Sequence, residues 1–210
     1  MDFKRYIHAH SDELLASLAA LVRIPSVEGE PGEGAPFGKE PARCLHEMLA
    51  LCEKLSFPTE NMDDRVGWCE YGEGEEMVAV LGHLDVVPAG DGWTESEPFS
   101  GEIKNGRIYG RGTMDDKGPM VAAVYALAAL KQSGFQPSRR IRVIFGTNEE
   151  TGCGDMAWYA SHGGEMPVMG FTPDGEYPLI NGEKGILNGT YTRTLHQTGD
   201  YILTRFEGGE

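Results

Sequence analysis

The sequence predicts an α/β protein whose sheet is largely parallel, and two observations lead to this prediction. Helical and strand patterns of moderate length alternate along the chain, which is typical of α/β folds. One expected strand, Met77–Gly82, is a continuous apolar run, as in strands that helices cover on both faces. With 210 residues, 40% of them hydrophobic and 24% charged, the chain can bury a substantial core.

The first part of the chain is helical in pattern. Apolar residues recur at helical spacing over Asp2–Val22 and predict an amphipathic helix, which the segment 24–26 with its central proline ends. A loop rich in glycine and proline is expected over 29–38. A second helix is expected over Glu40–Leu55, with Pro41 suited to its first turn.

Strands and helices then alternate. The expected strands are Arg65–Tyr71, Met77–Gly82, Arg140–Phe145 and Pro167–Phe171. The expected helices are Gly118–Gln132 and Asp155–Ser161. A short hairpin is expected to turn at 104–106, where asparagine precedes glycine.

The organisation into domains is expected to be uneven. We assign 1–180 to the N-terminal portion of the α/β domain and 181–210 to the start of a second domain. About thirty residues cannot build an independent core. The chain is therefore expected to stop partway through a larger protein.

The charge balance excludes several classes of function. Lys and Arg number 18 against 33 Asp and Glu, a formal charge of −15. This excess repels phosphate backbones and anionic lipids, so neither nucleic acid nor membrane is an expected partner. The first eleven residues lack the apolar core of a signal peptide, and a cytoplasmic location is expected. The four cysteines lack zinc-knuckle spacing and are expected to be buried or half-buried free thiols.

Polar side chains that could bind a metal follow three of the expected strands. His83 and Asp85 come after the first of these strands, Glu149 and Glu150 after the second, and Asp174 after the third. In parallel sheets ligands bind beyond the carboxyl ends of the strands. We therefore expect these side chains to meet at one edge of the sheet.

Each signal also has a simpler interpretation. Imidazole is a good zinc ligand and Asp85 could fix the tautomer of His83, yet a lone histidine is more often a satisfied core residue. Asp115 and Asp116 precede a buried helix, where carboxylates either favour the helix dipole or bridge divalent ions. Asp174 could simply form a turn.

The paired glutamates suit a division of labour. Neighbouring residues in extended backbone point to opposite sides, so one of Glu149 and Glu150 can face a metal while the other faces water. Nearby carboxylates raise the pKa of such a group toward the range of a general base. The simpler interpretation is an exposed acidic loop. Taken together, one histidine and several carboxylates at strand ends describe a two-metal hydrolytic site.

Four motifs in order resemble a known family. The segments are GHLDVVPAGDGW (82–93), YGRGTMDDKGP (109–119), TNEETG (147–152) and PDGEYP (173–178). They resemble the di-zinc exopeptidases that include acetylornithine deacetylase, succinyl-diaminopimelate desuccinylase and carboxypeptidase G. The doubled aspartate, PDGEYP and NGEKG (181–185) are most similar to the PepV/Sapep dipeptidase branch.

The resemblance implies a fold and a set of roles. The fold would be a three-layer α/β/α catalytic domain with a mostly parallel mixed sheet, incomplete at its C-terminal side. His83, Asp115 and Asp174 would hold one zinc ion, and Asp115 would bridge to a second ion held also by Glu150. Asp85 and Glu149 would be the catalytic pair. Asp85 would orient His83, and Glu149 would be the general base in hydrolysis of a dipeptide. Manganese or cobalt could replace zinc.

The family pattern also contains parts that this chain lacks. Family members continue into a lid domain that binds the developing oxyanion and return with a final histidine ligand for the second metal. His162 and His196 do not stand in a matching context. The second metal site is therefore expected to lack one ligand, and loss of an oxyanion donor typically costs about 10²–10³ in rate. The enzyme is therefore expected to be catalytically competent only in its full-length form.

Three functions remain to be weighed against the metallo-dipeptidase. The first is an N-acyl-amino-acid deacylase that uses the same chemistry. The second is a non-catalytic metal-binding remnant of such an enzyme. The third is an acidic α/β interaction domain, which would bind no stoichiometric zinc. The sequence does not indicate the oligomeric state or the preferred substrate side chains.

Overall fold

The computed structural model describes residues 3–175, 180–182, 185, 189 and 190. The chain divides into two units, Met1–Glu176 and Tyr177–Glu210. Every helix and strand described below lies in the first unit. The second domain expected from residue 181 falls mostly outside the described residues and stays a prediction.

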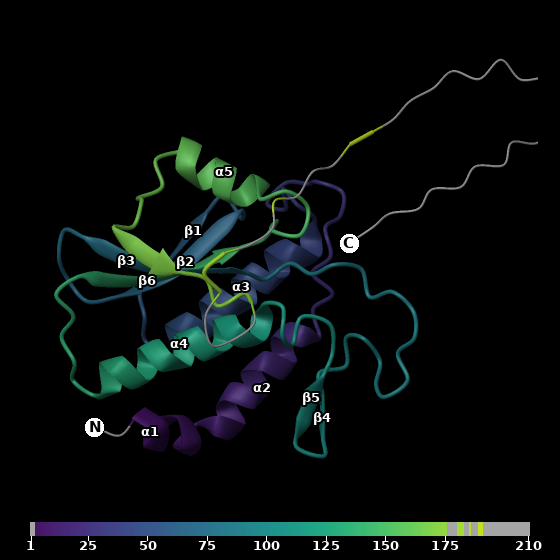
Figure 1. Cartoon of the computed structure of the whole chain (residues 1–210), viewed down its shortest axis with the longest axis horizontal. Helices are drawn as coiled ribbons and strands as arrows, with labels where there is room; N and C mark the ends of the chain where they lie inside the picture. The colour runs from purple at the N-terminus through teal and green to yellow at the C-terminus, as the bar shows by residue number, and fades with distance from the viewer. Residues whose placement is uncertain (1–2, 176–179, 183–184, 186–188, 191–210) are drawn as a thin grey trace, which may run out of the picture. The chain divides into compact units, whose positions relative to one another are not determined.

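Helices and strands alternate as the sequence predicts (Figure 1). The helices are α1 Phe3–Ala9, α2 Ser11–Val22, α3 Lys39–Lys54, α4 Lys117–Gln132 and α5 Gly154–Ser161. The strands are β1 Thr59–Met62, β2 Val66–Tyr71, β3 Met77–His83, β4 Glu102–Lys104, β5 Arg107–Tyr109, β6 Arg140–Gly146 and β7 Met169–Phe171.

The main sheet is mixed, with strand order β1-β2-β6-β3-β7. β3 pairs in parallel with both β6 and β7, whereas β2 is antiparallel to its neighbours β1 and β6. β2 thus runs against the other four strands, which confirms the prediction of a mostly parallel mixed sheet. The parallel arrangement of β3, β6 and β7 brings their carboxyl ends to one edge.

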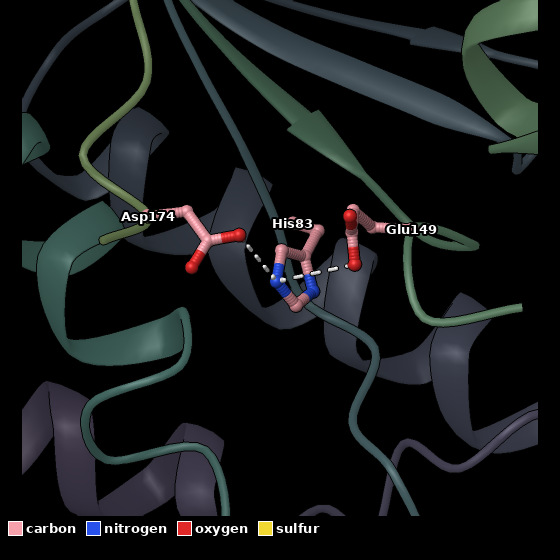
Figure 2. A group of neighbouring side chains, drawn as sticks. All are labelled: His83, Glu149 and Asp174. Atoms are coloured by element: carbon pink, nitrogen blue, oxygen red, sulfur yellow. Dashed lines mark ion pairs between the residues drawn. The ribbon is translucent and has the colours of Figure 1, made fainter. Parts of the chain in front are cut away.

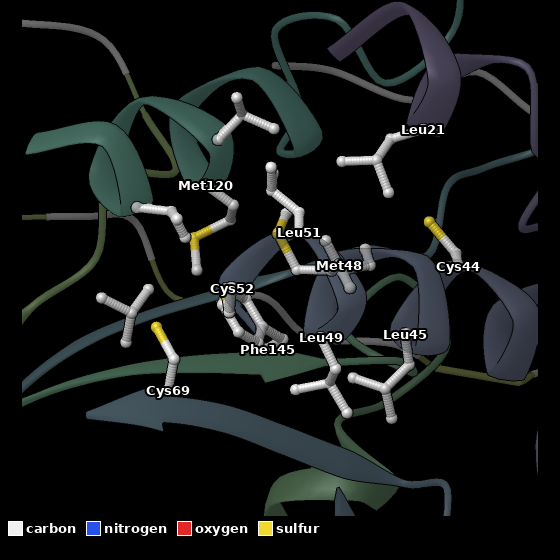
Figure 3. Packing of buried hydrophobic residues seen from close by; sticks show 14 of the residues in the cluster. Leu21, Cys44, Leu45, Met48, Leu49, Leu51, Cys52, Cys69, Met120 and Phe145 are labelled. Atoms are coloured by element: carbon white, nitrogen blue, oxygen red, sulfur yellow. The ribbon is translucent and has the colours of Figure 1, made fainter. Parts of the chain in front are cut away.

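Helices cover both faces of this sheet, which confirms the three-layer architecture (Figure 1). On one face α3 packs on β2 and α4 on β6, while α2 packs on these two helices. They share a large apolar cluster that includes Leu21, Leu45, Met120 and Phe145 (Figure 3). On the other face α5 contributes Tyr159 to a smaller cluster. Complete burial of such side chains stabilises the fold by about 1.5–3 kcal/mol each.

The cysteines fall into two environments. Cys44, Cys52 and Cys69 are free and buried within the larger cluster (Figure 3), as expected. Cys153 is also free but exposed, so the expectation of burial is wrong for this residue. It occupies a left-handed backbone conformation with φ of 55° just before the first residue of α5.

The secondary structure predicted from the sequence is wrong in two places. The helix expected over Asp2–Val22 is divided at His10, whose backbone leaves the helical region while its ring stacks on Tyr6. Strand β1 was not expected, because its residues are half-buried or exposed and its sequence has no apolar alternation. The hairpin at 104–106 is confirmed, since β4 and β5 pair around Asn105 and Gly106 at positive φ.

Strand β7 forms an apolar edge. Among the described residues nothing pairs with its outer side, and Met169 and Phe171 are more than half exposed. Apolar grooves of about 410 and 380 Å³ lie beside it, one lined by α4 and the other by α5. No helix in the described part of the chain has the length and apolar character needed to cross a membrane.

Candidate metal centre

His83 and Asp85 lie at the carboxyl end of β3 and are almost fully buried, with 2% and 1% of their side chains exposed. His83 is the last residue of β3 and pairs with Gly146, the last residue of β6. The burial of two polar side chains at this point requires that their hydrogen-bonding groups be satisfied.

The contacts of His83 fix the tautomer of its ring. Nδ1 lies 3.0 Å from the backbone carbonyl oxygen of Asp85 and 3.4 Å from its carboxylate. Because a carbonyl oxygen can only accept, Nδ1 carries the proton and donates it. Nε2 then presents a lone pair in the neutral ring, which is the form that binds metals.

Asp85 also holds the segment that carries the two glutamates. Its Oδ1 accepts the backbone N–H of Glu149 and its Oδ2 accepts that of Glu150, both at 3.1 Å. A single buried carboxylate thus connects the end of β3 to the segment that follows β6. The orienting role that the resemblance implied for Asp85 is compatible with this geometry, which adds a second role.

Three carboxylates surround Nε2 of His83. Asp115 Oδ1 lies at 3.0 Å, Asp174 Oδ2 at 3.4 Å and Glu149 Oε2 at 4.0 Å. Figure 2 shows the Glu149 and Asp174 side chains pointing toward the ring from opposite sides. Yet this buried nitrogen has no hydrogen-bond partner among the described residues.

Two sets of side chains could hold a metal ion. His83, Glu149 and Asp174 form one set, and His83, Asp115 and Glu150 form the other, with ligand atoms within 4.8 Å of one another in each set. An unpartnered imidazole nitrogen that faces several carboxylates fits a divalent cation. The structure therefore brings together all the residues that the sequence suggested for this site.

The grouping differs from the one that the resemblance implied. Asp115 and Asp174 were expected together at one ion, with Glu149 apart as the base. In the structure Glu149 is grouped with Asp174 at His83, while Asp115 is grouped with Glu150. All four carboxylates nevertheless lie around the one imidazole, so the assignment of individual ligands stays a prediction.

The crowding of carboxylates shifts several pKa values. Burial would lower the pKa of His83, but the hydrogen bond and charge of Asp85, with the charges of Asp116 and Asp115, raise it to about 10. The metal-free ring is therefore protonated near neutral pH, and a cation that binds at Nε2 must displace that proton. Partial burial raises the pKa of Glu149, and the nearby Asp174 raises it further. A raised pKa suits a carboxylate that must take a proton near neutral pH.

Asp116 has a role that sequence reasoning left unassigned. It is completely buried, and its Oδ2 accepts the backbone N–H of His83 at 3.2 Å. A Cβ on Gly82 would lie 2.0 Å from this oxygen, so the carboxylate crosses the strand where glycine leaves room. Burial raises the pKa of Asp116 to about 7. The glycine before His83 is the sequence signal that could have indicated this contact.

Lys117 anchors the next residue of the same segment. Its side chain is fully buried, and Nζ donates to the carbonyl oxygens of Leu21 and Ile24 at the end of α2, at 3.0 and 2.7 Å. Buried ammonium groups need such acceptors because removal from water is costly. Three consecutive side chains thus point to three different places. Asp115 lies at the metal centre, Asp116 binds β3, and Lys117 binds the end of α2.

Comparison with known proteins identifies a matching family and several relatives of this chain. The sequence model of peptidase family M20/M25/M40 matches residues 79–201. A putative dipeptidase, YtjP, of Bacillus subtilis is 45% identical, covering all of this chain and 46% of the relative. A Beta-Ala-Xaa dipeptidase of Lactobacillus delbrueckii is 40% identical, covering all of this chain and 45% of the relative.

A solved structure supports the same fold. The crystal structure of human carnosine dipeptidase 1 matches with a TM-score of 0.68 and 24% identity, over 83% of this chain and 41% of that protein. At this identity the likeness shows the fold alone. The chain spans about half the length of the curated relatives it matches.

Proposed function

Because the chain belongs to peptidase family M20/M25/M40, we propose that it is the N-terminal catalytic part of a metal-dependent dipeptidase. The observation that carries this proposal is the buried Nε2 of His83, which faces three carboxylates and lacks a hydrogen-bond partner among the described residues. The names of the two relatives described above support dipeptides as the substrate class. A cytoplasmic location stays a prediction from the sequence.

We propose zinc as the resident metal, with two ions in the complete enzyme and with manganese or cobalt as substitutes. The family uses divalent metal ions, and one imidazole with several carboxylates is a donor set that all three metals accept. The ligands would be His83, Asp115, Glu150 and Asp174. When bound, such ions polarise a carbonyl oxygen and lower the pKa of water.

The chain's own residues would perform the proton transfer. Glu149 is placed to act as the general base: nearly half of its side chain is exposed and its pKa is raised, so it can reach a water molecule and take its proton. Asp85 would orient the His83 ring through Nδ1. It would also hold the backbone of Glu149, so that base and ligand keep a fixed separation.

A deacylase of N-acyl amino acids is the second candidate, since the same metal centre would cleave its amide bond. To separate the two, the full-length gene product would be assayed with unblocked dipeptides and with N-acetyl and N-succinyl amino acids. The dipeptidase proposal predicts higher kcat/KM for unblocked dipeptides. A strong preference for the acylated compounds would favour the deacylase instead.

A metal titration of the present chain tests the site itself. Zinc binding that His83→Asn abolishes is the expected result. Metal binding by the full-length gene product without turnover on either substrate class would indicate a non-catalytic remnant. Absence of stoichiometric zinc would instead favour an acidic interaction domain.

A further inference from the structure

The segment Thr147–Glu150 leaves the end of β6 with four consecutive backbone N–H groups directed at two buried carboxylates. Asp85 accepts the last two, from Glu149 and Glu150. The first two belong to Thr147 and Asn148, and both donate to Oδ2 of Asp155, at 2.7 and 2.9 Å. Charge-assisted hydrogen bonds to backbone N–H groups are about twice as strong as neutral ones.

The burial and the hydrogen bonds of Asp155 hold its carboxylate at this contact. It lies in the first turn of α5 and is 1% exposed, and its Oδ1 accepts the N–H of Met156 at 2.7 Å. Asp155 therefore does more than favour the helix dipole, which an exposed acid in the first turn can also do. Its carboxylate is shared between the start of α5 and the segment that carries the glutamates.

The strand beneath Asp155 has a glycine where the carboxylate crosses it. A Cβ on Gly146 would lie 2.5 Å from Oδ2 of Asp155. The arrangement at β3 is equivalent, since Asp116 crosses Gly82 to accept the N–H of the following residue. In each case an aspartate at the start of a helix accepts the backbone N–H of the residue that follows a strand glycine.

We infer that Asp155 is a positioning residue that acts through the amides of Thr147 and Asn148 to hold Glu149 and Glu150 at the metal centre. The inference rests on the proposed function, because the two glutamates matter there as general base and metal ligand. Asp85 holds the glutamates from the side of β3, and Asp155 fixes the two residues that connect them to β6. Loss of Asp155 would leave both amides without their acceptor and loosen the segment, which the side chains of Thr147 and Asn148 still tie to Arg65 and Glu28.

Amide hydrogen exchange on the ¹⁵N-labelled, metal-free chain tests this inference without reference to catalysis. Asp155→Ala should speed exchange at least tenfold at Glu149 and Glu150, as well as at Thr147 and Asn148. Amides in the middle of α4 should not change. If exchange rises at 147 and 148 while 149 and 150 keep their wild-type rates, Asp85 alone positions the glutamates and the inference is wrong.

Cobalt binding provides the second measurement. Asp155→Ala should weaken Co²⁺ affinity about tenfold and alter the visible absorption of the bound ion, which reports on its ligand geometry. An unchanged spectrum and affinity would contradict the inference. A wild-type chain that binds no Co²⁺ would overturn the proposed metal site, while the exchange experiment would still decide the role of Asp155.

Two further variants separate positioning from general stability. Asp12 lies exposed in the first turn of α2, so Asp12→Ala removes a comparable helix-terminal acid far along the chain from the glutamates and should change neither measurement. Asp155→Asn keeps the shape and one accepting oxygen, so it remains folded if the alanine variant does not. It should show the same changes at smaller size, and wild-type behaviour of Asp155→Asn in both measurements would count against the inference.

Discussion

The metal centre has a buried floor and an exposed rim, and these two regions are stabilised differently. We define the floor as His83, Asp85, Asp116 and Asp155, which are at most 2% exposed. We define the rim as Asp115, Glu149 and Asp174, whose side chains are 61%, 47% and 32% exposed. Each floor aspartate accepts backbone N–H groups, whereas the rim carboxylates converge on one nitrogen.

The difference indicates that the fold itself organises the floor, while the rim depends on a cation. Hydrogen bonds within the chain satisfy most polar atoms of the floor, so its geometry exists before any ligand binds. The rim gathers like charges that repel one another at close range. Substitutions in the floor should therefore change folding and metal binding together, and substitutions in the rim should change metal binding alone.

The largest effect is expected from Asp85→Ala. This variant leaves the buried N–H groups of Glu149 and Glu150 without their acceptor and removes the carboxylate beside His83. We expect unfolding free energy to fall by about 3 kcal/mol, as measured by urea denaturation of the metal-free chain. Asp91→Ala, in the exposed loop that follows, is the control and should be neutral. A neutral Asp85 variant would contradict the description of the floor.

Replacement of His83 by asparagine, which removes Nε2, should abolish metal binding and should affect folding less than Asp85→Ala does. The side-chain amide of His83→Asn can still donate to the Asp85 carbonyl, but it has no counterpart of Nε2. In the wild type, zinc at about 100 times its Kd should stabilise by about 2.7 kcal/mol and raise Tm by about 5–10 °C.

That rise in Tm should vanish in His83→Asn and persist in His162→Asn, which changes an exposed histidine. Differential scanning calorimetry with and without zinc measures both. Retention of the zinc-dependent rise by His83→Asn would place the metal elsewhere.

A single rim substitution should separate metal affinity from stability. Asp115→Asn removes one charge next to His83 Nε2 and one potential ligand. We expect zinc affinity to fall at least tenfold in a calorimetric titration. The Tm of the metal-free chain should change little, because the variant relieves repulsion among the rim carboxylates but also removes a charge 3.0 Å from the protonated His83 ring. If Asp115→Asn lowers that Tm by several degrees, Asp115 belongs to the floor.

The smallest effect on stability is expected at a carboxylate outside the metal centre that is already paired with arginine side chains. Glu165 is paired with Arg140 and Arg142, and the hydrogen bond from Arg140 leads in lowering its pKa. A lowered pKa in the folded state stabilises above the ordinary pKa near 4.5, and this contribution is lost as pH falls through the folded value.

Glu165→Gln should therefore be slightly less stable than the wild type at pH 7, by about 1 kcal/mol or less, because the Glu165 side chain is 38% exposed. The difference should shrink as the pH falls below about 4.5. Urea denaturation at pH 7 and pH 3.5 measures it. A difference that grows toward low pH would have the wrong sign for an ion pair.

Much of the site could be predicted from the sequence because it depends on strand ends. The apolar runs of β3 and β6 and the polar residues after them are local signals, and parallel pairing brings them together. The direction of β2 and the existence of β1 depend on pairing with distant strands, which the local pattern does not encode. The contacts of Asp116 and Asp155 depend on the register between layers. The strand glycines Gly82 and Gly146 signal a close approach, but spacing along the chain does not identify the side chain that approaches.

The most direct test of the floor and rim is X-ray absorption spectroscopy of the chain loaded with one equivalent of zinc. We predict one imidazole nitrogen and carboxylate oxygens at about 2.0–2.2 Å from the metal, with the imidazole contribution lost in His83→Asn. Zinc held by sulfur at about 2.3 Å, or by oxygens alone in the wild type, would contradict a metal centre built on His83.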